Sequence, residues 1–241
     1  MFKSKVKKNT VSKTSEILSK EQPFSYREAY NALRTNFNFA SLDGQLKTIA
    51  ITSTIPGEGK TTFSINLAIS MIEMGKKVLL IDADLRNPSI HRYLRLRQQE
   101  IIGLSHLLSS KHKLTESVGH LEKLKLDIVL SGPIPPNPVE LLSSGNFDKI
   151  LEEAKGEYDL IIIDTPPVGI VTDASVISQF ADGVIVVVGQ GKPTVNQIKK
   201  TKSNLERVNA NVIGSVLNNY DSRKDNKSSG DDYFYYYGNG E

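Results

Sequence analysis

The sequence predicts an α/β fold, a mostly parallel β-sheet with helices packed on both of its faces. Six apolar runs are long enough for buried strands, and helical or loop-length segments separate them. The runs are continuous rather than alternating, which is typical of strands buried on both faces of a parallel sheet. One of them is followed by a Gly-rich turn and then a helical pattern, the order of elements that a phosphate-binding loop requires.

The first helix is predicted from about Ser25 to Phe39, because Ser25-x-x-Glu28 has the spacing of a capping box. Apolar residues then recur at helical intervals: Tyr26, Tyr30, Leu33 and Phe37. The helix after the Gly-rich turn ends near Gly75 and has one apolar face: Phe63, Leu67, Met71 and Met74.

The remaining elements are assigned from the apolar runs and the stretches between them. Strands are expected at Lys47–Ser53, Val78–Ile81, Leu126–Leu130, Leu160–Ile163, Val184–Val188 and Val212–Leu217. Helical or loop-length stretches are expected at Pro138–Ala154 and Pro193–Arg207. The segment Ser131–Pro138 holds four prolines in eight residues, which predicts an irregular loop leaving the carboxyl end of a strand.

The 241 residues suit one domain with a flexible segment at each end. We expect a basic arm at 1–22, a folded domain at 23–220 and a tyrosine-rich tail at 221–241. In the first twenty residues of the arm six lysines face one acid, Glu16, although the net charge of the chain is only +3. The arm is interpreted as solvated, with a weak contact to anionic lipid or an acidic partner as the alternative. Nothing else in the chain favours nucleic-acid binding.

The absence of cysteine excludes disulfides, cysteine-based metal sites and a cysteine nucleophile, and it suits a reducing compartment. The first residues lack the apolar segment of a secretory signal. The apolar runs are far shorter than the roughly 20 residues that span a bilayer. We therefore expect a cytoplasmic protein.

The turn Ser53–Thr62 reads Ser-Thr-Ile-Pro-Gly-Glu-Gly-Lys-Thr-Thr and has the composition of a phosphate loop. Small residues let backbone N–H groups point at phosphate oxygens, Lys60 supplies a charge for the β and γ phosphates, and the Thr61 hydroxyl suits Mg²⁺. Thr54 stands where the generic pattern has glycine, so a merely structural turn is the alternative. The residues expected to hold nucleotide are Pro56, Gly57, Glu58, Gly59, Lys60, Thr61 and Thr62.

Two buried strands end in acid at the sheet edge where the loop also lies. Val78–Ile81 runs into Asp82-Ala-Asp84-Leu-Arg86, and Leu160–Ile163 runs into Asp164-Thr-Pro-Pro. A single aspartate at a strand end is more often a solvated turn residue. The two strands that end in acid and the phosphate loop together indicate phosphoryl transfer. Asp164 is expected to orient the metal, and Asp82 and Asp84 to share that duty or to accept a proton from an attacking hydroxyl.

The last residues carry a tyrosine cluster, Tyr233, Tyr235, Tyr236 and Tyr237, in a polar, Gly-rich context. Four exposed tyrosines without a function would favour aggregation, so we interpret them as phosphate acceptors. The dozen or so residues after Tyr220 give a contour reach of ~40 Å and a flexible span of ~20 Å. That reach suffices to deliver a tyrosine to the same or an adjacent site.

Together, Pro-Gly-Glu-Gly-Lys-Thr, Asp-x-Asp-x-Arg, Ile-Ile-Ile-Asp-Thr-Pro and the tyrosine cluster resemble the bacterial tyrosine kinases of capsule and exopolysaccharide operons, of the CpsD and CapB type. The resemblance extends from about Tyr26 to the last tyrosine. It implies a P-loop NTPase fold of the deviant Walker-motif branch, related to MinD and ParA, with ATP and Mg²⁺ as cofactors.

The resemblance also implies roles for individual residues. Gly57 to Thr62 would hold the ATP phosphates, and Lys60, Asp82, Asp84 and Asp164 would form the catalytic set. Metal ligands would come from Thr61, Asp84 and Asp164. The four tail tyrosines would be autophosphorylated, and Asn218 matches a position that contacts adenine, with a buried or capping asparagine as the alternative.

Assembly and partners follow from the same resemblance. The family's Glu-x-x-Arg-x-x-Arg motif, which packs against a neighbouring subunit in a ring, is matched by Glu28 and Arg34, while Asn31 replaces the first arginine. A simple amphipathic helix covering the sheet is the alternative. Further implied partners are a membrane-anchored polysaccharide co-polymerase adaptor that activates the kinase at the plasma membrane, protein tyrosine substrates and a cognate phosphatase.

Two other functions share the fold. A MinD- or ParA-like ATPase switch would carry a further lysine where this chain has Ile55, and would lack the tyrosine cluster. A nucleotide-gated scaffold would bind ATP without forming phosphotyrosine. Only the chemistry separates these alternatives from the kinase.

Overall fold

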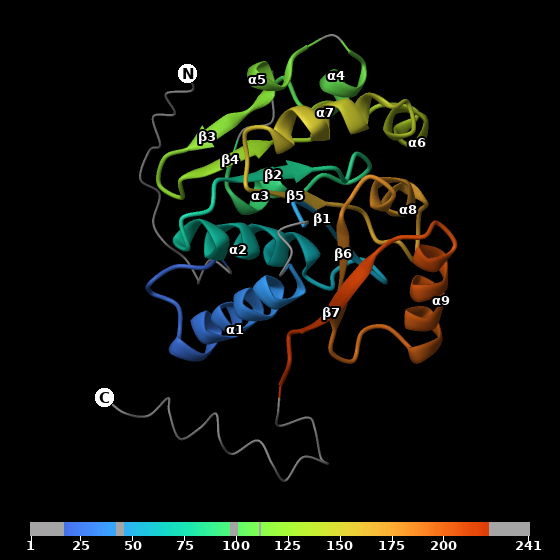
Figure 1. Ribbon diagram of the computed structural model, residues 1–241. Helices are drawn as coiled ribbons and strands as arrows, with labels where there is room; N and C mark the ends of the chain where they lie inside the picture. The colour runs from blue at the N-terminus through green and yellow to red at the C-terminus, as the bar shows by residue number, and fades with distance from the viewer. Residues whose placement is uncertain (1–16, 42–45, 97–100, 111, 222–241) are drawn as a thin grey trace.

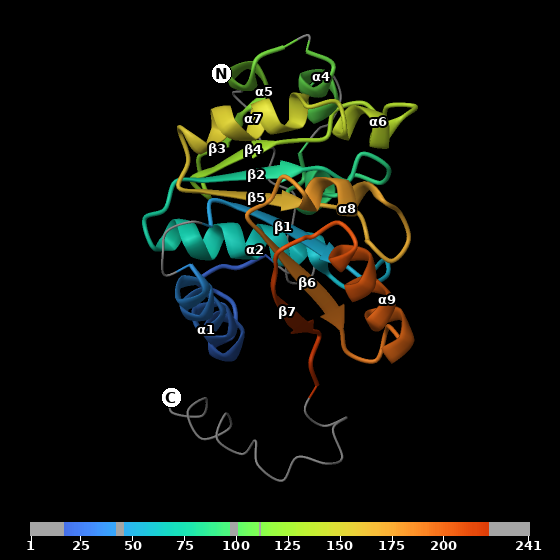
Figure 2. The ribbon, with the colours of Figure 1, turned by 45° about the vertical axis from the view of Figure 1, so that its right-hand side comes forward.

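The computed structural model describes residues 17–41, 46–96, 101–110 and 112–221. A seven-stranded sheet with strand order β3-β4-β2-β5-β1-β6-β7 runs through the molecule, and helices cover both faces (Figures 1 and 2). Every strand pair in the sheet is parallel except β3 with β4. The predicted α/β class is confirmed. The expected tyrosine cluster at 233–237 lies outside the described residues.

The central strands are β1 (Thr48–Ser53), β2 (Val78–Asp82), β5 (Leu160–Asp164) and β6 (Gly183–Gly189), with β4 (Leu126–Val129) beside β2. They match the predicted runs to within one or two residues at each end. All residues of β1, β2 and β5 are buried, as continuous apolar runs require.

Two edge strands depart from the expectation. Strand β3 (Gly119–Leu121) pairs antiparallel with β4 and was not predicted, because three residues carry no periodic signal. Strand β7 (Val212–Asn218) was predicted to be covered on both faces, but Leu217 is 54% exposed. The reason is its position at the end of the sheet, where β6 is its neighbour on one side only.

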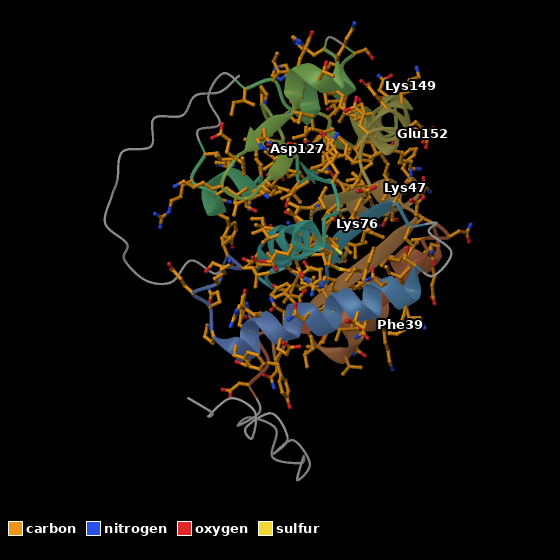
Figure 3. The ribbon with its side chains drawn as sticks, turned by 60° about the vertical axis from the view of Figure 1, so that its left-hand side comes forward. Phe39, Lys47, Lys76, Asp127, Lys149 and Glu152 are labelled. Carbon is orange, nitrogen blue, oxygen red and sulfur yellow. The ribbon has the colours of Figure 1, made fainter. Side chains whose placement is uncertain are left out.

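One face of the sheet is covered by α2 (Lys60–Glu73) and by α1 (Phe24–Ala40), which packs on α2, while α3 (Ile90–Tyr93) follows β2. Helix α2 is buried on all sides from Thr61 to Met71, and not along one stripe only. Met74, predicted on its apolar face, follows the last helical residue and is 46% exposed. Phe39, near the end of α1, is likewise exposed (Figure 3).

The capping box predicted at Ser25 and Glu28 is wrong. Helix α1 begins at Phe24 with Pro23 as its N-cap, so Ser25 already lies within the helix and no side chain caps it. The reason is local: Pro23 has φ −51° and ψ 146°, which sets the entry into the helix one residue earlier than the pattern suggested. Leu18, in the segment expected to be a flexible arm, is buried, and its N–H donates to Asn66 Oδ1 (2.7 Å).

The helices of the opposite face are α4 (Leu104–Leu108), α5 (Leu114–Ser117), α6 (Pro138–Leu142), α7 (Asn146–Lys155), α8 (Asp173–Ser178) and α9 (Val195–Glu206). The stretch Pro138–Ala154 divides into α6 and α7 because Gly145 adopts a left-handed φ of 74° between them. Pro138, assigned to the irregular loop, is the first residue of α6, where a missing N–H costs nothing.

Candidate active site

The Gly-rich loop joins the carboxyl end of β1 to the first turn of α2, as predicted. Gly57 and Gly59 adopt left-handed φ angles of 79° and 87°. A side chain at Gly59 would also collide with Asn218, since a Cβ there would lie 2.1 Å from Asn218 Nδ2. Gly59 is the N-cap of α2 and provides no side-chain cap, so the first turn of this helix is suited to bind an anion through its backbone.

Glu58 holds the loop from inside rather than facing a ligand with its carboxylate. The side chain is fully buried, and its two oxygens accept hydrogen bonds from Ile55 N (2.8 Å) and Gly189 N (2.9 Å). Asn218, expected near adenine, donates to the Glu58 carbonyl oxygen (2.8 Å), and Lys192 Nζ donates to the Gly57 carbonyl oxygen. The ends of β6 and β7 thus brace the loop.

The predicted lysine and acids meet at the carboxyl edge of the sheet. Lys60 Nζ lies 3.3 Å from Asp84 Oδ2 and 3.4 Å from Asp164 Oδ2. Thr61 Oγ1 donates to Asp164 Oδ2 (2.7 Å). Asp82 and Asp164 are partners in the register of β2 and β5, because the two parallel strands end side by side. The three aspartates, Lys60 and Thr61 are therefore one buried cluster.

Two further residues of this cluster were not predicted from the sequence. Ser64 donates to Asp164 Oδ1 (3.2 Å) and to the Lys60 carbonyl oxygen. Ser64 comes four residues after Lys60 on the same helix, and this spacing could have predicted that the two residues share one face. Ser89 Oγ lies 2.9 Å from Thr61 Oγ1, and it comes from a loop whose sequence shows no periodic pattern.

The charges of the cluster are out of balance. Burial raises the pKa of Asp82 to about 8, and Asp164 adds to the shift, while Lys60 opposes it. Burial also raises the pKa of Asp164. Burial opposes the charge of Lys60, yet Asp164, Asp84 and Asp82 together raise its pKa above the usual 10.5. One ammonium group among three carboxylates leaves an excess of negative charge, which a divalent cation would neutralise.

The oxygens in the cluster fit magnesium. Carboxylate and hydroxyl oxygens are the ligands that this hard cation prefers, and Thr61 Oγ1, Asp84 Oδ2 and Asp164 Oδ2 all surround the same ammonium group. Asp82 Oδ1 is buried and has no hydrogen-bond partner among the described residues. An orphaned carboxylate oxygen beside a set of oxygen ligands suits a site for a cation and its waters.

The free energy of unfolding of the metal-free protein is expected to fall as pH rises from 5.5 to 8.5. The folded state raises the pKa of Asp82, so its contribution to stability is full below about pH 4 and lost as pH approaches 8. Asp164 acts in the same direction. The decrease should be on the order of a few kcal/mol. Urea unfolding in EDTA measures it.

Asp82→Asn is the control for this pH dependence. The variant removes the titrating group, so most of the decrease should disappear, while histidines and surface carboxylates contribute equally to both proteins. An unchanged pH slope in Asp82→Asn would show that Asp82 titrates normally.

Glu28 and Arg34, expected at a subunit contact, lie on α1. Glu28 Oε2 accepts from Asn31 Nδ2 (3.1 Å), and Arg34 Nη1 donates to the Ser70 carbonyl oxygen of α2 (3.3 Å). Both contacts are within the chain, and both residues are only partly buried. Among the described residues, no helix is long and apolar enough to cross a bilayer.

Known proteins that resemble this chain include tyrosine-protein kinases and a septum site-determining protein. The family described as an AAA domain matches residues 46–218. Tyrosine-protein kinase YwqD of Bacillus subtilis is 43% identical over 79% of this chain and 80% of its own length. Tyrosine-protein kinase CpsD of Streptococcus pneumoniae serotype 4 is 41% identical over 86% of this chain and 91% of its own.

Solved structures agree with these relatives. The chimerical protein CapA2B2 superposes with a TM-score of 0.78 at 38% identity, covering 86% of this chain and 91% of its own. MinD of Pyrococcus horikoshii, solved with Mg-ADP, superposes with a TM-score of 0.61 at 26% identity, covering 73% and 71%. The sequence identity to the two tyrosine-protein kinases is therefore much higher than the identity to MinD.

Proposed function

The chain belongs to the bacterial tyrosine-protein kinases, and we propose that it transfers the γ-phosphoryl group of Mg-ATP to the tyrosines of its own C-terminal segment. The acceptors would be Tyr233, Tyr235, Tyr236 and Tyr237. The observation that carries the proposal is the convergence of Lys60, Thr61 and three strand-end aspartates at a Gly-rich helix N-terminus. Such a site can bind phosphate, hold a divalent cation and accept a proton.

The residues of the loop and of the metal site have distinct proposed tasks. The backbone N–H groups of residues 57–62 would bind the ATP phosphates. Lys60 would move away from the carboxylates of Asp84 and Asp164 to contact the β and γ phosphates. Thr61, Asp84 and Asp164 would hold Mg²⁺, which when bound neutralises charge on the transferred phosphoryl group. Asn218, at the end of β7, would lie beside the nucleotide base.

The proton of the attacking tyrosine would pass to an aspartate. A new bond forms between the tyrosine Oη and the γ phosphorus, the bond from the γ phosphorus to the bridging oxygen breaks, and ADP leaves. Asp82 is favoured as acceptor because its Oδ1 is unpaired among the described residues and its pKa is raised. A phenol with a pKa of about 10 loses its proton more readily to such a group than to an ordinary carboxylate.

We further propose that the kinase regulates polysaccharide synthesis and export through a membrane-anchored activator. The similarity to the chimerical protein CapA2B2 supports pairing of this kinase with a partner protein. Glu28 and Arg34, partly exposed on α1, would contact a neighbouring subunit in the dephosphorylated oligomer. Each phosphate adds about −1.5 to −2 charges, so phosphorylated tails would repel one another and the acidic site, and a cognate phosphatase would reset the oligomer.

Mapping the phosphorylated residues tests the proposal. The purified chain, a chain ending at Gly230 and Lys60→Met are incubated with Mg-ATP, with and without a candidate activator, and analysed by mass spectrometry. We expect phosphate on the four tail tyrosines of the full chain alone, and a smaller oligomer after phosphorylation. ADP release without phosphotyrosine, even with the activator present, would instead indicate an ATPase switch.

A further inference from the structure

Arg86 ends the Asp-x-Asp-x-Arg motif, and the functions proposed so far give it no task. Its Nε donates to both carboxylate oxygens of Asp173, at 2.9 Å and 3.1 Å. Asp173 is only 1% exposed, whereas the Arg86 side chain is 43% exposed. A buried carboxylate thus has an arginine from a distant loop as its partner, and losing this partner would leave its charge uncompensated.

The ion pair joins the two segments that carry the proposed metal ligands. Arg86 lies in the loop after β2, two residues beyond Asp84, and Asp173 is the first residue of α8, beyond the loop that follows Asp164. The loop after β2 is also held at its far end, where Ser89 contacts Thr61 and Ile90 N donates to Asp82 Oδ2 (3.2 Å). The ion pair of Arg86 with Asp173 attaches this loop to α8.

The loop after Asp164 is itself fixed to β1. Thr52 Oγ1 donates to the Pro166 carbonyl oxygen (2.9 Å) and accepts from Val168 N (3.2 Å). Helix α8 also packs against β1. Asp173 therefore belongs to a rigid part of the molecule, against which the loop that carries Asp84 can be held.

We propose that Arg86 and Asp173 are positioning residues for phosphoryl transfer. Their ion pair holds the loop after β2 against α8, and thereby keeps Asp84 at the distance from Asp164 that joint binding of one divalent cation requires. The inference rests on the proposed metal site. Neither residue touches the reacting atoms, so both act through Asp84.

The test compares Arg86→Gln, Arg86→Lys, Asp173→Asn and the double variant Arg86→Gln/Asp173→Asn in the full-length chain. Four quantities are measured: kcat for phosphotyrosine formation, Mn²⁺ affinity of the ADP complex, ADP affinity in EDTA, and Tm. Lys155→Gln is the matched control, since it removes a lysine that pairs with Glu152 (2.9 Å) and Asp182 (3.7 Å) at the opposite edge of the sheet.

Arg86→Gln should lower kcat by about 10- to 100-fold, because a displacement of about 1 Å in a catalytic group has an effect of this size. Mn²⁺ affinity should fall at least about tenfold, while ADP affinity in EDTA stays within about twofold. Because a single nitrogen of Arg86 makes both contacts, a lysine ammonium can replace it. Arg86→Lys should therefore keep most of the wild-type kcat and Mn²⁺ affinity. The double variant should be no worse than the poorer single variant, since both break one interaction.

Wild-type kcat and Mn²⁺ affinity in Arg86→Gln would overturn the inference. So would losses that multiply in the double variant, or an equal loss of kcat in Lys155→Gln at a matched Tm. Failure of the proposed function gives a different result, namely no phosphotyrosine from the wild-type chain. The Mn²⁺ affinities then still decide whether Arg86 positions the cation ligands.

Discussion

Lys60→Met is expected to reduce phosphotyrosine formation by at least about 10³-fold. The lysine would compensate the charge that develops on the transferred phosphoryl group, and methionine keeps its length without its charge. The rate of phosphotyrosine formation under saturating Mg-ATP measures the loss. A rate within about tenfold of the wild-type rate would remove Lys60 from the proposed mechanism.

The same substitution should also destabilise the metal-free protein at pH 8, by about 3–5 kcal/mol. Lys60 Nζ lies beside Asp84 and Asp164, so methionine leaves these buried carboxylates without their cation. The loss should shrink at pH 5.5, where the aspartates with raised pKa can take up protons. Lys155→Met, at the opposite edge of the sheet, should show little pH dependence in its effect.

Asp164→Asn should show changes of opposite sign in activity and stability. The kinase activity should fall by about 10²- to 10⁴-fold, because a proposed ligand of the cation loses its charge. The metal-free protein should be at least as stable as wild type, since burial disfavours the charged form of Asp164 and the substitution removes that charge from the cluster. Asparagine can still accept from Thr61 through its Oδ1.

Denaturant unfolding in EDTA, with parallel activity assays, checks this second prediction. A marked loss of stability in Asp164→Asn would mean that hydrogen bonds from Thr61 and Ser64 outweigh the repulsion among the aspartates. Asp159→Asn is the control, because Asp159 Oδ2 accepts from Lys77 N on the surface, far from the cluster. It should leave the kinase activity unchanged.

The sequence predicted the central sheet and the convergence of the cluster for the same physical reason. Parallel strands buried on both faces are continuous apolar runs, and their carboxyl ends share one edge, so Asp82 and Asp164 had to lie near Lys60. Strand β3 and the short helices α3, α4 and α5 were missed because three to five residues carry no periodic signal.

The remaining differences arise from tertiary context. Pro23 overrode the local capping pattern at Ser25. Asp173 is 87 residues from Arg86 in the sequence, and only the fold brings the two together. Glu58 was predicted to hold nucleotide, yet its carboxylate accepts hydrogen bonds from Ile55 N and Gly189 N. These contacts depend on β6 lying next to β1.

The strand order has a consequence for synthesis on the ribosome. Strand β5 lies between β1 and β2, so the first two central strands cannot pair with each other. Lys60 and Asp164 are 104 residues apart, and the bond from Thr52 to Pro166 spans 114. Two strands that are fully buried in the folded protein therefore leave the ribosome long before their shared partner does. This nascent chain has to be kept from aggregating until β5 emerges and the sheet can close around it.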